Sequence, residues 1–306
     1  MELLYALEKI RNPFLDTVLG AITHFGGEAV FMAVAIFVLW CTNKKTGYYL
    51  LTVGFTGTLI NQTLKLIFKI PRPWVKDPNF TIVESAREAA TGYSFPSGHT
   101  QNAVGTFGSL ACSVKKNWLR ITLTVLALLV AFSRMYLGVH TPLDVGVSLL
   151  IASALIFIFK WVFDLIEKKP YVMYILLAVM TAMSVAYLLF VLYFPLGEVD
   201  EANYNSGLKN AYTLFGALLG ALVGYTLDSR YIKFKTDAAP WAQAIKYIAG
   251  LAVVLAVKSL LKAPLYALFD GSYVADAVRY FIIVIIASAL WPLTFGFFSR
   301  LGKEKS

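Results

Sequence analysis

The sequence predicts an all-α protein, a polytopic bundle of helices in a membrane. Hydrophobic residues make up 58% of the 306 residues and charged residues only 15%, more than the core of a soluble domain requires. Apolar segments that approach or reach the length of a membrane span recur from residue 28 almost to the end of the chain. The net charge of +9 lies mainly in the loops, which indicates membrane topology and argues against nucleic acid as a partner.

Nine hydrophobic segments are the expected helices of this bundle. They lie near residues 28–43, 48–70, 99–114, 119–138, 141–163, 171–194, 208–228, 242–261 and 277–299. The first and third are short for a full span, and both carry polar or small residues that suit packing against other helices.

The first 27 residues are predicted to form an interfacial amphipathic helix. Leu4, Leu7, Ile10 and other apolar residues recur there at roughly helical spacing between charged residues. No long apolar core precedes a small-residue cleavage site, so the segment does not resemble a signal peptide.

Basic residues gather in alternate loops and set the expected orientation. They are Lys44, Lys45, Lys115, Lys116, Arg120, Lys160, Lys168, Lys169, Arg230, Lys233, Lys235, Lys246, Arg300, Lys303 and Lys305. By the positive-inside rule this side is cytoplasmic. The long loop 71–98 and the turn 138–141 fall on the opposite side. We therefore expect a multi-pass protein, of a bacterial cytoplasmic membrane, with these two loops facing outside.

Three short segments place charged and imidazole side chains at the ends of these apolar helices. The first, residues 65–73, holds Lys65 and Arg72, seven residues or about two helical turns apart. Prolines flank Arg72, so the helix is expected to end there and to project the guanidinium from its end. Charge at a membrane helix end is costly and usually marks a functional site.

The other two segments complete the set. In residues 96–99, Ser97 takes the place of an N-cap before Gly98 and His99, and a capped helix start is a ready anion site. In residues 133–144, His140 and Asp144 are four apart, so the carboxylate can reach a ring nitrogen and fix its tautomer. Three cations, two histidines and a carboxylate together suit the binding and cleavage of a phosphate ester.

This set resembles the signature of the type 2 phosphatidic acid phosphatase superfamily, over roughly residues 60–145. The motifs are Lys-x6-Arg-Pro, Pro-Ser-Gly-His and Ser-Arg-x5-His-x3-Asp, all in order. The resemblance implies that His140 is the nucleophile, supported by Asp144, and that His99 is the general acid. The implied clamp on the phosphoryl oxygens consists of Lys65, Arg72, Ser97, Gly98 and Arg134.

The resemblance implies no cofactor and no metal, and the partners it implies are a lipid phosphate substrate and the bilayer. His24, the third histidine, stands alone and is expected to be structural. Each motif alone also has a structural reading, as a helix cap, a charge pair at a helix start or a lysine that snorkels to the headgroups. Their joint occurrence favours the site.

The expected organisation has three parts: an interfacial helix at 1–27, a catalytic core at 28–165 and an accessory transmembrane bundle at 166–306. Gly216, Gly220 and Gly224, at every fourth position, favour close helix contact in the last part. That bundle either only packs on the core, or shapes a lateral path for a lipid tail, or forms a homodimer.

Three classes of function stay open from the residues. The first is a metal-independent membrane phosphatase that hydrolyses a lipid phosphate monoester or a polyprenyl diphosphate at the outer face through a phosphohistidine. The second is a phosphotransferase of the same fold that passes the phosphoryl group to a lipid or sugar acceptor. The third, a transporter or binding protein without catalysis, is disfavoured by the intact set of charged residues.

Overall fold

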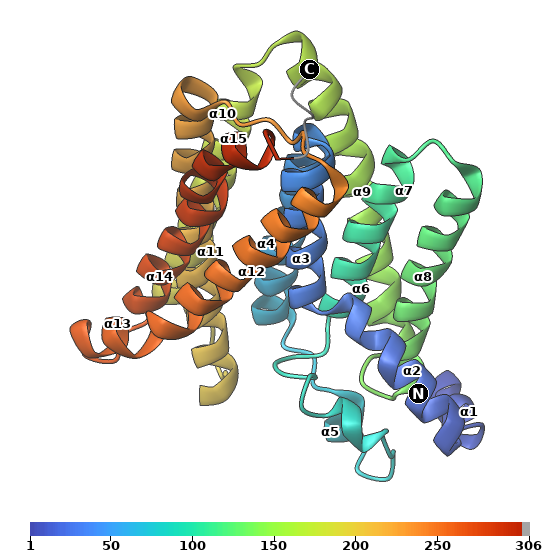
Figure 1. Ribbon diagram of the computed structural model, residues 1–306. Helices are drawn as coiled ribbons and strands as arrows, with labels where there is room; N and C mark the ends of the chain where they lie inside the picture. The colour runs from blue at the N-terminus through green and yellow to red at the C-terminus, as the bar shows by residue number, and fades with distance from the viewer. Residues whose placement is uncertain (302–306) are drawn as a thin grey trace. The chain divides into compact units, whose positions relative to one another are not determined.

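The computed structural model describes residues 1–301, and within these residues the regular elements are all helical (Figure 1). The prediction of an all-α polytopic protein is confirmed. Lys303 and Lys305, which contributed to the predicted orientation, lie outside the described residues.

The N-terminal part and the segments that carry the motifs are formed by the following elements. They are α1 (Glu2–Lys9), α2 (Pro13–Thr23), the 3-10 turn η1 (His24–Gly26), α3 (Glu28–Phe37), the π-helical turn η2 (Val38–Thr42), α4 (Lys44–Phe68), α5 (Pro73–Lys76), the 3-10 turn η3 (Glu84–Ala86), α6 (Gly98–Ala103), the π-helical turn η4 (Val104–Gly108), α7 (Ser109–Ser113), α8 (Asn117–Tyr136) and α9 (Pro142–Lys168).

The remainder of the chain adds α10 (Val172–Tyr193), α11 (Glu201–Leu227), the π-helical turn η5 (Asp228–Ile232), α12 (Pro240–Leu260), α13 (Lys262–Leu268), α14 (Val274–Ile285), the π-helical turn η6 (Ile286–Leu290), the 3-10 turn η7 (Trp291–Thr294) and α15 (Phe295–Phe298).

Six helical stretches of the described chain are long and apolar enough to cross a membrane. They are 117–136, 142–168, 172–193, 201–232, 240–268 and 274–298. A seventh is formed by 13–26 together with 28–42, two helices bent by 53° at their junction, if that pair is one span. Two predicted segments do not pass: α4 contains several polar residues, and the stretch from α6 to α7 is short.

The chain divides into two compact units that interleave along the sequence. Unit 1 comprises residues 1–34, 49–162 and 196–206, and unit 2 comprises 35–48, 163–195 and 207–306. All residues of the three motifs belong to unit 1. The expected boundaries at 27 and 165 stay a prediction.

The N-terminal segment of unit 1 consists of two helices, where one amphipathic helix was expected. The break lies at Asn12, whose side-chain oxygen accepts a hydrogen bond from the backbone N–H of Leu15 and caps α2. Pro13 fills the first position of α2, which suits a helix start. Leu19 of α2 packs against Tyr136 and Leu137 at the end of α8. These helices therefore support the turn that carries the third motif.

An antiparallel seam joins α4 to the stretch from α6 to α7 within unit 1. A Cβ added at Gly98 would lie 3.9 Å from the side-chain oxygen of Asn61, and one at Gly105 would lie 3.4 Å from Val53. Between them, Gln101 lies directly against Gly57. Lys65, one turn beyond Asn61, donates to the carbonyl oxygen of Tyr93, four residues before the helix cap at Ser97.

In unit 2 the glycine series brings α11 close to α14 and η6, as the sequence predicted (Figure 1). Gly216 lies directly against the backbone of Ala277, and Gly224 lies directly against the Ser288 side chain. A Cβ at Gly220 would lie 3.0 Å from the carbonyl oxygen of Phe281. Such close approach is the usual role of small residues between membrane helices.

Candidate active site

The candidate site lies where α4 ends, α6 begins and the turn between α8 and α9 passes between them. Lys69, at φ 49°, follows the end of α4 in the left-handed conformation, and Pro73 then begins α5 with Arg72 at the preceding position. Ser94 donates its backbone N–H to the carbonyl of Ile70, at 2.8 Å, so the end of the long loop returns to its beginning. The first motif (residues 65–73) and the second motif (residues 96–99) are therefore held side by side.

His140 and Asp144 are buried and face each other. Nδ1 of His140 lies 3.4 Å from Oδ2 of Asp144. The same oxygen accepts hydrogen bonds from the Ser94 hydroxyl, at 2.5 Å, and from the backbone N–H of Thr141, at 2.7 Å. These two donors fix the carboxylate beside the imidazole, so the position of Asp144 does not depend on the histidine alone.

Arg72 makes the contact that assigns the histidine tautomer. Its Nη1 lies 2.9 Å from Nε2 of His140. A guanidinium can only donate, so Nε2 accepts and the proton of the neutral ring is on Nδ1, toward Asp144. Arg72 is itself held by three carbonyl oxygens, those of Gly92 (3.0 Å), Val139 (2.9 Å) and Thr91 (2.6 Å). The lone pair of the neutral ring is thus on Nε2, the position from which the ring could act as a nucleophile.

Arg134 is fully buried at the end of α8 and holds two unused donors. Nη1 donates to the hydroxyl of Thr23, at 2.7 Å. Nε and Nη2 are buried and have no hydrogen-bond partner anywhere in residues 1–301. Lys65, also buried, donates to the carbonyl oxygen of Tyr93. A buried cation with unpaired donors is costly unless an anion is bound there.

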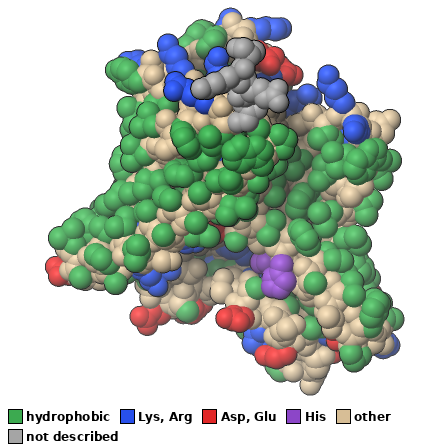
Figure 2. Space-filling view, in the orientation of Figure 1, with side chains coloured by type: hydrophobic (Ala, Val, Ile, Leu, Met, Phe, Trp, Pro, Cys, Tyr) green, Lys and Arg blue, Asp and Glu red, His purple; other side chains and the backbone are tan. Residues whose placement is uncertain are grey.

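Ser97 caps α6 as predicted. Its hydroxyl oxygen lies 3.4 Å from the backbone nitrogen of Thr100 and accepts the Thr100 hydroxyl at 2.9 Å. His99, on the first turn, is half-buried, and its imidazole is close enough to Arg134, Arg72 and Lys65 to feel their charges. Histidine side chains are visible at the molecular surface in Figure 2. His140 is only 1% exposed, so its ring is reached from inside the site.

Burial and charge keep the imidazole of His140 neutral. Burial lowers the pKa of His140 well below its usual range, and the neighbouring charges of Arg72, Arg134 and Lys65 lower it further. Burial also lowers the pKa of Arg72 to about 10, while the charge of Asp144 opposes that shift. At neutral pH the arginine is therefore still a cation and the histidine is a neutral base.

The turn between α8 and α9 is fixed by Gly138 and by the N-terminal segment. Gly138 has φ 80°, and a Cβ there would lie 2.7 Å from Nη2 of Arg11 and 3.0 Å from the ring of Phe80. Arg11 donates from Nε to the carbonyl of Tyr136, at 2.9 Å, and from Nη1 to that of Thr81, at 2.7 Å. The N-terminal helices therefore take part in positioning His140.

All eight residues predicted for the site lie in this one region of unit 1; their roles stay predictions. Sequence reasoning missed Thr23, Ser94, Arg11, Asn61 and Gln101. Asn61 lies one turn before Lys65, and Gln101 lies three residues after Gly98, so helical spacing from the motifs would have found both. Both side-chain amides are buried without partners among the described residues. In the same part of the chain, no group of three histidine, cysteine or acidic side chains is placed to hold a metal ion.

Comparison with known proteins assigns the sequence to a family. Residues 45–167 match the PAP2 superfamily, and residues 212–304 match the transmembrane extension of PAP2 superfamily phosphatases. The chain is 31% identical over 165 residues to undecaprenyl-diphosphatase BcrC of Bacillus subtilis. The aligned region covers 53% of this chain and 80% of that protein. The chain belongs to the PAP2 superfamily.

Two further relatives that are similar in sequence to this PAP2 protein are lipid phosphatases by name. Phosphatidylglycerophosphatase B of Bacillus subtilis is 29% identical, over 49% of this chain and 76% of the relative. Lipid A 4'-phosphatase of Bacteroides thetaiotaomicron is 28% identical, over 55% of this chain and 76% of the relative. No solved structure matches. This multi-pass membrane protein is thus a member of a family of phosphatases.

Proposed function

We propose that this PAP2 protein is a metal-independent phosphatase that hydrolyses a lipid phosphate monoester or a polyprenyl diphosphate through a phosphohistidine. The observation that carries the proposal is the pair of unused donors on Arg134, buried beside His140 and Arg72. Buried donors without partners suit the oxygens of a phosphoryl group, on which charge is spread in the transition state.

In the proposed first step, Nε2 of His140 attacks phosphorus and the bond from phosphorus to the leaving oxygen breaks. Burial and the neighbouring cations lower the pKa of His99 to about 3 in the free site, so in this scheme the bound phosphate dianion offsets those charges and allows the ring to carry a proton. His99 then protonates the leaving oxygen, which leaves as an alcohol or a phosphate. In the second step a water molecule, deprotonated by His99, attacks the phosphohistidine and the P–N bond breaks, which releases phosphate. Asp144, facing Nδ1 at 3.4 Å, stabilises the positive charge that develops on the ring.

The clamp in this proposal consists of Lys65, Arg72 and Arg134, with the hydroxyl of Ser97 and the backbone N–H of Gly98. The first three supply positive charge from side chains, so the scheme assigns no step to a metal ion. The relatives' names support the class of substrate: an undecaprenyl diphosphatase, a phosphatidylglycerophosphatase and a lipid A phosphatase. The substrates that these names imply share a phosphate or diphosphate attached to an apolar lipid.

We further propose that the site opens on the outer face of a bacterial cytoplasmic membrane. The loop and turn that carry the site alternate with the basic loops along the chain. This alternation is what the positive-inside rule expects of an outward-facing site.

Trapping the covalent intermediate tests the proposed chemistry. Purified protein mixed with a radiolabelled lipid phosphate and denatured in alkali, where phosphohistidine survives, should carry label. His140→Ala should carry none and release no phosphate. Lys65→Met should lose most of its turnover, whereas Lys76→Met, an exposed lysine of the following helix, should keep it. Turnover by His140→Ala at the wild-type rate would refute the nucleophile, and loss of wild-type activity with EDTA would refute the metal-free scheme.

A further inference from the structure

A second candidate site lies in unit 2, at the end of four helices where α4 begins, α9 ends, α10 begins and α11 ends. A pocket of about 390 Å³ opens there. Its lining comes from these four helix ends and includes Lys44, Tyr48, Met173, Asp228 and Lys233. None of these residues belongs to the active site described above.

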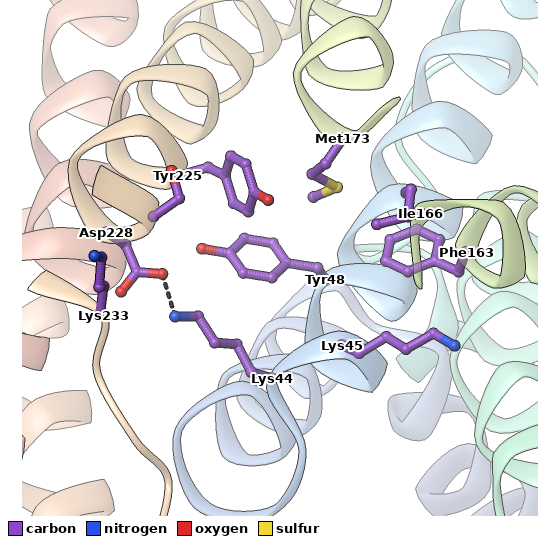
Figure 3. A pocket seen from close by; sticks show the side chains of 10 residues that line it. Lys44, Lys45, Tyr48, Phe163, Ile166, Met173, Tyr225, Asp228 and Lys233 are labelled. Atoms are coloured by element: carbon purple, nitrogen blue, oxygen red, sulfur yellow. Dashed lines mark ion pairs between the residues drawn. The ribbon is translucent and has the colours of Figure 1, made fainter. Parts of the chain in front are cut away.

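The polar side of this pocket is basic. Three lysines line it against a single carboxylate, that of Asp228. Asp228 is buried and forms an ion pair with Lys44, which fixes that ammonium group in the wall (Figure 3). Lys45 forms ion pairs with Glu167 (2.7 Å) and Asp164 (3.5 Å), whose carboxylates are largely exposed. Exposed pairs of this kind contribute little, so a better-placed anion can replace them.

A buried hydroxyl without a partner points to a ligand. Tyr48 is 7% exposed, and within the described residues its hydroxyl makes no hydrogen bond. Figure 3 shows the ring of Tyr48 reaching into the pocket, next to Tyr225 and above the Lys44–Asp228 pair. The two rings meet edge to face, with centroids 5.3 Å apart, so the hydroxyl is held in this direction. An unpaired buried hydroxyl is costly, and a bound acceptor oxygen would remove that cost.

The other side of the pocket is apolar. Phe163, Ile166 and Met173 form that wall. Tyr171 and Tyr231, close in sequence to Met173 and Lys233, expose 58% and 76% of their side chains. Exposed tyrosines at helix ends are typical of the membrane–water interface. A ligand that fits both walls carries an anionic oxygen group next to an apolar chain.

We propose that this pocket binds the headgroup of an anionic phospholipid from the leaflet on the lysine-rich side. Its phosphate accepts hydrogen bonds from Tyr48 and Lys233, and the start of an acyl chain contacts Phe163, Ile166 and Met173. Lys45, on the other side of the pocket in Figure 3, adds positive charge. Basic pockets between membrane helices on the cytoplasmic side are suited to such headgroups. That this is the cytoplasmic leaflet rests on the orientation proposed above; the binding itself does not.

Native mass spectrometry of the purified full-length protein tests the proposal, with dioleoyl phosphatidylglycerol and dioleoyl phosphatidylcholine as probes. Wild type should bind one phosphatidylglycerol about tenfold more tightly than phosphatidylcholine. Lys233→Glu should abolish this preference, whereas Lys235→Glu, an exposed lysine two residues away and outside the lining, should keep it. Tyr48→Phe, which removes only the hydroxyl, should weaken phosphatidylglycerol binding several-fold, about what one hydrogen bond contributes, while the melting temperature of the lipid-free protein stays equal or rises.

Three outcomes would overturn the proposal. One is equal binding of the two lipids, and another is equal weakening by Lys233→Glu and Lys235→Glu, which would indicate general surface charge. The third is displacement of phosphatidylglycerol by millimolar inorganic phosphate, which would assign the pocket to a free anion. Phosphatidylglycerol is a phosphodiester and not a substrate of the proposed phosphatase. His140→Ala should therefore bind it like wild type, and failure of either proposal can be recognised without the other.

Discussion

At the residue scale, one contact determines how the candidate nucleophile is presented. Arg72 donates to Nε2 of His140, and Asp144 faces Nδ1. The ring therefore has its proton on the side of the carboxylate and its lone pair on the side of the cations. Because Arg72 is anchored by three carbonyl oxygens, the imidazole is oriented from both sides by groups that are themselves fixed.

The pH dependence of activity follows from this environment. In the proposed reaction the neutral imidazole is the nucleophile, and burial with three nearby cations lowers the pKa of His140 well below its usual range. The base form therefore persists as the pH falls through 6.5, the ordinary value for histidine, and activity should be lost only at lower pH. A profile of kcat/KM against pH with a lipid phosphomonoester measures the acid limb. A midpoint at or above 6.5 would contradict this environment for His140.

Asn61 is predicted to strengthen phosphate binding at a cost to the stability of the protein. Its amide is buried without a partner among the described residues and lies next to Gly98. Asn61→Leu removes both unpaired atoms at similar volume, so the melting temperature should stay equal or rise. The inhibition constant of inorganic phosphate should rise about fivefold, the loss of one hydrogen bond of ~1 kcal/mol.

Gln101→Leu is the matched control for this variant. Gln101 is also buried and unpaired within the described chain, but it lies one turn further from the motif, against Gly57. It should show the same change in stability without the change in phosphate inhibition. If both variants weaken phosphate equally, Asn61 has no specific part in the clamp.

At the scale of elements, the turn between α8 and α9 depends on a glycine with no room for a side chain. Gly138→Ala should destabilise the protein by about 1–3 kcal/mol, because its φ of 80° is strained for alanine and the added Cβ would meet Arg11 and Phe80. Turnover should fall as well, since the turn carries His140. Thermal unfolding and phosphate release measure the two effects.

Gly146→Ala, in α9, is the control for the turn. Nothing lies within 4 Å of a Cβ added there, and the residue is helical. Alanine should raise stability by about 0.5–1 kcal/mol, its ordinary advantage over glycine in a helix. Equal behaviour of the two variants would show that Gly138 is not required by the turn.

At the scale of the whole molecule, the proposed orientation can be tested by labelling. In a protein whose native Cys41 and Cys112 are replaced by alanine, Ser85→Cys should react with an impermeant maleimide added to intact cells. Lys168→Cys should react only after the membrane is permeabilised. Both positions are exposed in the structure, so the difference reports the side of the membrane. The reverse pattern would invert the proposed topology.

Much of the site could be predicted because its residues lie beside local signals for helix ends. Prolines around Arg72, the cap at Ser97 and the spacing of His140 and Asp144 are all readable within a few residues. Thr23 and Arg11 could not be found in this way: they meet Arg134 and Tyr136 across 111 and 125 residues, and no local pattern marks such pairs. The prediction of a single N-terminal helix was wrong. The apolar periodicity continues across Asn12, but the cap at Asn12 starts a new helix there.

The contact between Arg72 and Nε2 of His140 has a consequence for selectivity. An uncharged electrophile has no anionic oxygen to accept the hydrogen bond that Arg72 donates to Nε2. The lone pair of the imidazole is therefore expected to stay blocked toward ordinary acylating or alkylating compounds. In the proposed reaction, a doubly negative phosphate accepts the Nη1 hydrogen that otherwise points at Nε2, while the three carbonyl oxygens keep the guanidinium in place. The lone pair of Nε2 then becomes free to react. In the proposed reaction, selectivity for a charged substrate therefore arises at the nucleophile itself and does not depend on the length of the lipid tail.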